Sequence, residues 1–127
     1  MSAPDTSLSP DPRPQIEEGP SGAQVSGSLC GACGYAVALE RPRCPVCHAD
    51  RLEPRRFGPG GTVWSSTVVR IPVAGRTPPY TLAYVNLDEN GPRILAHVIG
   101  SDAAPAVGAR VRLTGVGADG DAEVEAA

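Results

Sequence analysis

Large apolar residues are sparse at the start of the chain and frequent in its second half. Residues 1–28 are rich in Ser, Pro, Gly and Ala, and they include few large apolar side chains such as Ile16 and Val25. Such a segment cannot bury enough apolar surface to offset the conformational entropy that it loses on ordering. We therefore predict that residues 1–28 form a disordered tail.

The second half alternates between turn signals and short runs of β-branched and aromatic residues, which suit the pleated surface of a sheet. Strands are predicted at residues 61–71, 80–87, 93–99, 110–116 and 122–125. The Asn90-Gly91 pair favours a tight turn between the second and third of these, so they should form an antiparallel hairpin. Short strands at this spacing predict a small β-barrel or sandwich over residues 57–127.

One predicted strand, residues 93–99, is apolar on one face and mixed on the other. Arg93 and His97 alternate there with Leu95 and Ile99. A fully solvated face would be more polar. The pattern favours a closed barrel whose outer face contacts another molecule.

Composition and charge narrow the classes of function. The net charge is −3 over 127 residues, so no general attraction to nucleic-acid backbones is expected. No run of residues approaches the ~20 apolar residues of a membrane span, and the first residues lack the basic and apolar regions of a secretion signal. We expect a cytoplasmic location, where paired cysteines are metal ligands more often than disulfides.

All four cysteines lie in two CxxC motifs, CGAC and CPVC, separated by ten residues. Each CxxC turn directs two sulfur atoms at one point, and two such turns complete the tetrahedron that zinc prefers. We predict a structural zinc site in a ribbon over residues 29–56. Its ligands are Cys30, Cys33, Cys44 and Cys47. Four thiolates leave no open coordination position for catalysis.

Two alternatives to the zinc site remain. The cysteines can pair as disulfides, although nothing indicates export. Cys44 to His48 also matches the CxxCH pattern of haem attachment, but Met1 is the only methionine available as an axial ligand and a second CxxC would be left over. The zinc ribbon either only stabilises the N-terminal part of this chain or forms a rigid surface that docks onto another protein or onto nucleic acid.

No catalytic constellation stands out in the barrel. His97 lacks a recognisable nucleophile or carboxylate partner in sequence, so we interpret it as a strand histidine with a hydrogen-bonded or exposed tip. Trp64 is expected to fill the core, and Tyr80 and Tyr84 to line the barrel.

The order of these parts resembles a known family. The similarity begins at LCGACGYAVALERPRCPVCHADRLE, continues through GTVWSSTVVRIPVAGRTPPYTLAYVNLDENGPRILAHVIG and fades after ARVRLTG. This pattern is similar to that of the rubredoxin-like zinc-ribbon plus OB-fold family of acyl-CoA-associated proteins, which accompany thiolases and thiolase-like condensing enzymes. Many members carry amphipathic helices before the ribbon, whereas this chain is rich in Pro, Gly and Ser there.

The resemblance implies a mostly β fold in which an N-terminal zinc ribbon precedes a small OB-fold barrel. It implies a non-catalytic accessory or scaffold protein that binds a thiolase-like or ketoacyl synthase-like partner and helps to bind acyl-CoA. Arginine forks suit the phosphates of CoA, and the candidates are Arg55, Arg56, Arg70 and Arg76. The alternatives are a nucleic-acid-binding module, because zinc ribbons and OB-folds often serve that role, and a stand-alone acyl-CoA enzyme.

Overall fold

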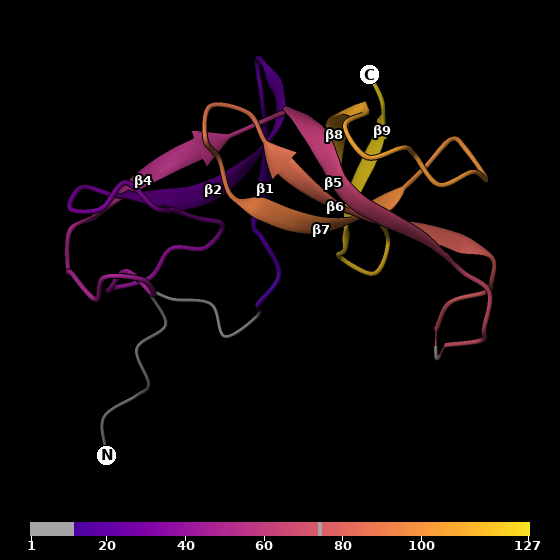
Figure 1. The fold of residues 1–127 in the computed structure, drawn as a ribbon, viewed down its shortest axis with the longest axis horizontal. Coiled ribbons are helices and arrows are strands. Elements are labelled where there is room, and N and C mark those ends of the chain that lie inside the picture. Colours follow the sequence, from indigo (N-terminus) through magenta and orange to yellow (C-terminus); the bar gives the residue numbers. More distant parts are fainter. Residues whose placement is uncertain (1–11, 74) are drawn as a thin grey trace.

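The computed structural model describes residues 12–73 and 75–127, and all regular elements in that part of the chain are β-strands (Figure 1). The strands are β1 (Ile16–Gly19), β2 (Gly22–Cys30), β3 (Ala36–Val37), β4 (Leu52–Phe57), β5 (Gly60–Val69), β6 (Tyr80–Leu87), β7 (Arg93–Val98), β8 (Arg110–Val116) and β9 (Ala122–Ala126). The first four form one sheet, and the last five form a closed barrel.

The barrel runs in the order β5-β6-β7-β9-β8, and β8 pairs back with β5. All of its neighbours are antiparallel except β7 and β9, which are parallel. The predicted barrel and the predicted hairpin of β6 and β7 are thus confirmed. The residues with positive φ in the hairpin turn are Glu89 and Asn90, one position earlier than the Asn90-Gly91 pair suggested.

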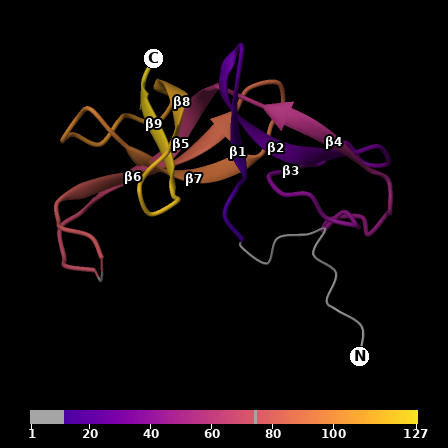
Figure 2. The same cartoon turned by 180° about the vertical axis from the view of Figure 1, so that it is seen from behind.

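The N-terminal sheet and the barrel share one apolar core. Ala23 and Val25 from β2 and Phe57 from β4 belong to the same buried cluster as Val63 and Val85 of the barrel. Strands β1 and β2 pack against β8, and Figure 2 shows the N-terminal sheet beside the barrel. The N-terminal sheet and the barrel therefore form one packed unit.

The prediction of a disordered tail over residues 1–28 is wrong for its second half, whereas residues 1–11 lie outside the described part of the chain. Residues 16–19 form β1, and β2 begins at Gly22 and pairs with β1, β3 and β4. The small residues that suggested disorder are instead required by close packing. A Cβ atom at Gly27 would lie 2.2 Å from the carbonyl oxygen of Val37.

The boundary at residue 57 is also displaced. Phe57 is the last residue of β4 and pairs with Val25, whereas the barrel strands begin at Gly60. The same clusters of Gly and Pro that indicate turns in the sequence separate the sheet from the barrel at residues 58–59.

Replacement of Val25 by alanine tests whether β2 belongs to the folded core. Val25 is 0% exposed, so we expect Val25→Ala to lower the free energy of unfolding by about 2 kcal/mol, through lost burial and a residual cavity. Val107→Ala is the matched control, because Val107 is 74% exposed and should lose little. Denaturant unfolding of the two variants gives the comparison, and equal stabilities would contradict the placement of β2.

Candidate metal centre and barrel pocket

The four cysteines converge at the end of the N-terminal sheet. Their Sγ atoms all lie within 4.8 Å of one another. The sulfur atoms of Cys30 and Cys47 are 3.6 Å apart, and those of Cys33 and Cys44 are 3.7 Å apart. Strand β2 delivers Cys30 as its last residue, and the turns at residues 31–35 and 44–49 carry the other three.

The two CxxC turns have the same local construction. The amide of Gly34 donates to the carbonyl of Cys30, and the amide of His48 donates to the carbonyl of Cys44, both at 2.9 Å. Gly34 has φ 79° and His48 has φ 65°, so each turn closes with a left-handed residue directly after its second cysteine. His48 thus occupies the position that glycine fills in the first turn, which explains its place beside the motif in backbone terms.

The thiols of the cluster strongly influence one another. Hydrogen bonds from the amides of Cys33 and Ala32 help to lower the pKa of Cys30 to about 6. The amide of Tyr35 lowers the pKa of Cys33, but burial and the neighbouring sulfur atoms outweigh it and raise that pKa to about 12. Four thiolates at this spacing therefore need a cation to ionise together, and the donor set fits one metal ion.

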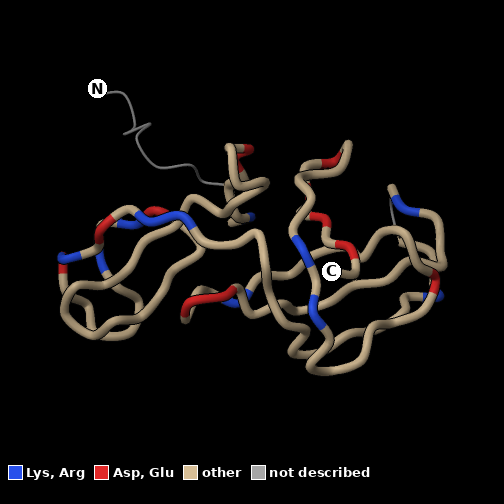
Figure 3. The backbone as a smooth tube through the Cα atoms, turned by 90° about the horizontal axis from the view of Figure 1, so that it is seen from above, with Lys and Arg blue, Asp and Glu red and all other residues tan. Residues whose placement is uncertain are grey.

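The four arginines predicted to bind CoA phosphates do not meet. Arg55 and Arg56 lie on β4, where Arg56 pairs with Glu17 at 2.7 Å. Arg70 is exposed just after β5, and Arg76 pairs with Asp119 and Asp121. Figure 3 shows basic and acidic segments side by side in both halves of the molecule. No phosphate site is formed from these four residues alone.

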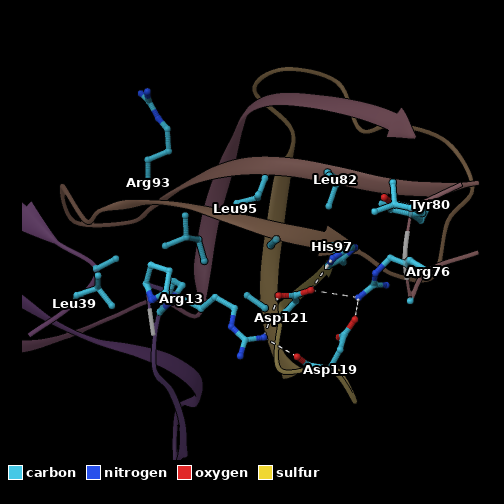
Figure 4. A pocket seen from close by; sticks show the side chains of 18 residues that line it. Arg13, Leu39, Arg76, Tyr80, Leu82, Arg93, Leu95, His97, Asp119 and Asp121 are labelled. Atoms are coloured by element: carbon cyan, nitrogen blue, oxygen red, sulfur yellow. Dashed lines mark hydrogen bonds and ion pairs between the residues drawn. The ribbon is translucent and has the colours of Figure 1, made fainter. Parts of the chain in front are cut away.

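A pocket of about 640 Å³ lies against the outer face of β6 and β7. Val73, Gly75 and Arg76 bound one end together with Asp119 and Asp121, and residues 12–14 and 38–39 from the N-terminal part bound the other. Apolar side chains form much of its wall (Figure 4). Among them are Ala38, Leu39, Leu82 and Leu95.

A network of charges closes one end of this pocket. Arg76 binds Asp119 and Asp121, and Arg13 donates to the carbonyl of Asp119 at 2.6 Å and approaches Asp121 at 3.4 Å. Partial burial raises the pKa of Asp119, but its own amide and the Arg76 charge outweigh this and hold the pKa below its usual range. Two arginines facing two aspartates leave this end with little net charge (Figure 4).

His97 lies beside this network and is largely buried. Its Nε2 atom is 3.4 Å from Asp121, and its ring packs against Tyr80 with centroids 5.7 Å apart. Its Nδ1 atom is buried and has no hydrogen-bond partner in the described part of the chain. Sequence analysis did not identify Asp121 as the neighbour of His97, because His97 lies on β7 and Asp121 lies in the loop before β9.

The prediction that Trp64 fills the core and that Tyr84 lines the barrel is wrong. Both side chains point outward, at 49% and 43% exposure. Val63, Ala83 and Val85 take the inward positions beside them, and Trp64 lies at a β-bulge between Val63 and Ser65 of β5. Tyr80 is half-buried and lines the pocket instead.

The barrel and the cysteine cluster together define the class of protein. A closed five-stranded barrel in this order is an OB-fold, and here a sheet with a four-cysteine cluster precedes it. Residues 55–116 match the family model of the ChsH2 C-terminal OB-fold domain.

The similarity extends beyond the barrel. A chain of the solved structure described as the Ltp2-ChsH2(DUF35) aldolase is 25% identical in sequence, with a TM-score of 0.64. The match covers 81% of this chain and 84% of the other. No curated protein sequence matches the chain significantly.

Metal analysis of the purified protein tests the cysteine cluster. We expect about one metal ion per chain, and Cys44→Ser should lose it together with the order of both CxxC turns, because ligand binding and folding are coupled in such sites. His48→Gly is the control, since glycine suits the left-handed backbone and the His48 ring is not among the clustered ligands. Metal-free protein with four cysteines paired as disulfides would contradict this assignment.

Proposed function

We propose that this chain is a non-catalytic accessory subunit that binds a thiolase-like enzyme and helps to bind its acyl-CoA substrate. The observation that carries the proposal is the similarity to a chain of the Ltp2-ChsH2(DUF35) aldolase, which spans the N-terminal sheet and the barrel alike. Together with the ChsH2 family match of residues 55–116, it relates this chain to the ChsH2 component of such a complex.

The chemistry of the described residues supports an accessory role. The four cysteines are gathered into one cluster, so they do not serve as free nucleophiles. His97 faces Asp121, but no serine, threonine or cysteine side chain hydrogen-bonds to it in the described part of the chain. Catalysis would then come from the partner, as in a complex that divides binding and chemistry between subunits.

Zinc is the metal that we propose for the cysteine cluster. Four thiolates in two CxxC turns form a closed tetrahedral set, which suits zinc and leaves no position for substrate. Its role would be to fix the two turns and the end of β2. Thiolates persist in a reducing compartment, and we propose the cytoplasm on that ground.

The apolar pocket on β6 and β7 is the part of the chain that suits an acyl arm. Its walls include Leu82 and Leu95, and its volume of about 640 Å³ is typical of a small-molecule site. Because Arg55, Arg56, Arg70 and Arg76 lie apart, we propose that the partner supplies most of the contacts to the CoA phosphates.

The nucleic-acid alternative is disfavoured by the same pocket. OB-folds that bind single strands use the face of their second and third strands and the flanking loops, which here are β6, β7 and the loops of residues 70–79 and 117–121. Those loops carry Asp119 and Asp121, which neutralise Arg76 and Arg13. Arg93 on this face and Arg70 beside it have no carboxylate partner among the described residues, and two positive charges gain little from a phosphate backbone.

Co-expression with the thiolase-like protein encoded nearest to its gene tests the proposed function. We expect the two chains to co-elute on a sizing column, because a permanent accessory subunit buries a large interface. The complex should also bind acyl-CoA more tightly than either chain alone, as judged by calorimetric titration. Separate elution, with full enzyme activity in the partner alone, would contradict the proposal.

A further inference from the structure

The outer face of the barrel carries a cluster of exposed side chains, and only some of them line the barrel pocket. We call the side chains of Trp64, Tyr84, Arg93 and Leu95 the tryptophan patch. Tyr84 on β6 lies directly opposite Leu95 on β7, and the Trp64 and Tyr84 rings meet edge to face with centroids 6.1 Å apart. Trp64, Tyr84 and Leu95 are 49%, 43% and 46% exposed.

A β-bulge aims Trp64 into this patch. The register between β5 and β6 shifts between Val63 and Ser65, so Trp64 has no residue directly opposite it. Bulges of this kind redirect a side chain and are often associated with functional positions. The three apolar side chains thus come from three neighbouring strands and form one continuous exposed area.

Arg93 is held rigidly over the patch. Its guanidinium carbon lies 3.7 Å from the centroid of the Trp64 ring, and its Nε atom donates to Oδ1 of Asn86 at 2.8 Å. Several other arginines pair with carboxylates, among them Arg56 with Glu17, Arg76 with Asp119 and Arg110 with Asp88. Within residues 12–73 and 75–127, Arg93 forms no ion pair with a carboxylate.

This combination suits a protein partner better than solvent. Trp, Tyr and Arg are the residue types most enriched at the energetic centres of protein interfaces, where preorganised side chains lose little entropy on binding. Contiguous exposed apolar patches often mark sites of interaction with another protein. The stacked guanidinium presents its remaining N–H groups as a fork that matches a carboxylate.

We infer that the tryptophan patch is the surface on which the partner enzyme docks, and that the partner presents an apolar surface with a carboxylate for Arg93. This inference rests on the proposed function and names the docking surface for it. Arg93 and Leu95 also line the barrel pocket, so a partner seated on the patch would reach the rim of that pocket. Figure 4 shows Arg93 pointing away from the charged end of the pocket.

The charges around the tryptophan patch favour a protein partner with a single carboxylate at Arg93 over a polyanion such as a nucleic acid. Asp88 and Glu89 line the hollow that Arg93 and Asn86 share at the hairpin end of β6 and β7. Asp88 is paired with Arg110, so Glu89 is the carboxylate here that would repel the phosphates of a nucleic acid extending along the face. One ring face of Trp64 is already covered by Arg93, which reduces its use as a base-stacking platform.

The chain offers a direct probe of this surface, because Trp64 is its only tryptophan. The full chain, labelled with 5-fluorotryptophan, should give one ¹⁹F resonance that shifts and broadens when the unlabelled thiolase-like protein encoded nearest to its gene is added. Arg93→Glu should weaken the complex by about thirtyfold or more, as the loss of an interface centre does. Arg112→Glu is the matched charge reversal on β8, outside the patch, and should leave the affinity unchanged.

Metal content and the midpoint of thermal unfolding establish that the Arg93→Glu variant is folded. A complex that forms on the sizing column, with an unchanged ¹⁹F resonance and equal affinity for Arg93→Glu, overturns the docking surface and leaves the proposed function standing. Failure of the unsubstituted chain to form any complex removes the proposed function and this inference with it. A resonance shift on adding a single-stranded oligothymidylate, with none from the partner, overturns the inference in favour of nucleic-acid binding.

Discussion

Strand β2 is the element on which the arrangement of this protein depends. It pairs with β1, β3 and β4, it ends at the ligand Cys30, and its Val25 is buried in the core that the barrel shares. Its glycine at position 27 permits the close approach of Val37 and the Phe57 ring. Because the same strand contacts the cysteine cluster and the barrel, a metal ion bound at one end would stabilise the packing at the other.

The barrel separates packing from recognition by strand alternation. Inward residues of β5 to β9 fill a small core, so the outward residues of β5, β6 and β7 are free for binding. One part of that outer face forms the apolar pocket with its balanced charges, and the adjoining part forms the tryptophan patch. This division would allow one surface to contact a protein partner and the other to hold a ligand.

The features that sequence analysis predicted correctly are those with a local signal. The strands predicted at 80–87 and 93–99 match β6 and β7 within one residue, and the two CxxC motifs predict which cysteines meet. Strand β2 was not predicted, because its small residues are typical of disordered segments. Close packing between strands also requires small residues. The position of Trp64 and the pairing of Arg76 with Asp119 depend on a bulge and on loop contacts, which have no local signature.

Amide hydrogen exchange, measured with and without the bound metal, tests most directly whether β2 joins the cysteine cluster and the barrel into one body. In metal-loaded protein, the amides of β2 should exchange nearly as slowly as those of β6, because both strands are paired on two sides and buried. Removal of the metal by a chelator should accelerate exchange first in β2, β3 and β4 and later in the hairpin of β6 and β7. Exchange of residues 16–28 at the rate of an unstructured peptide in the loaded protein would contradict this account.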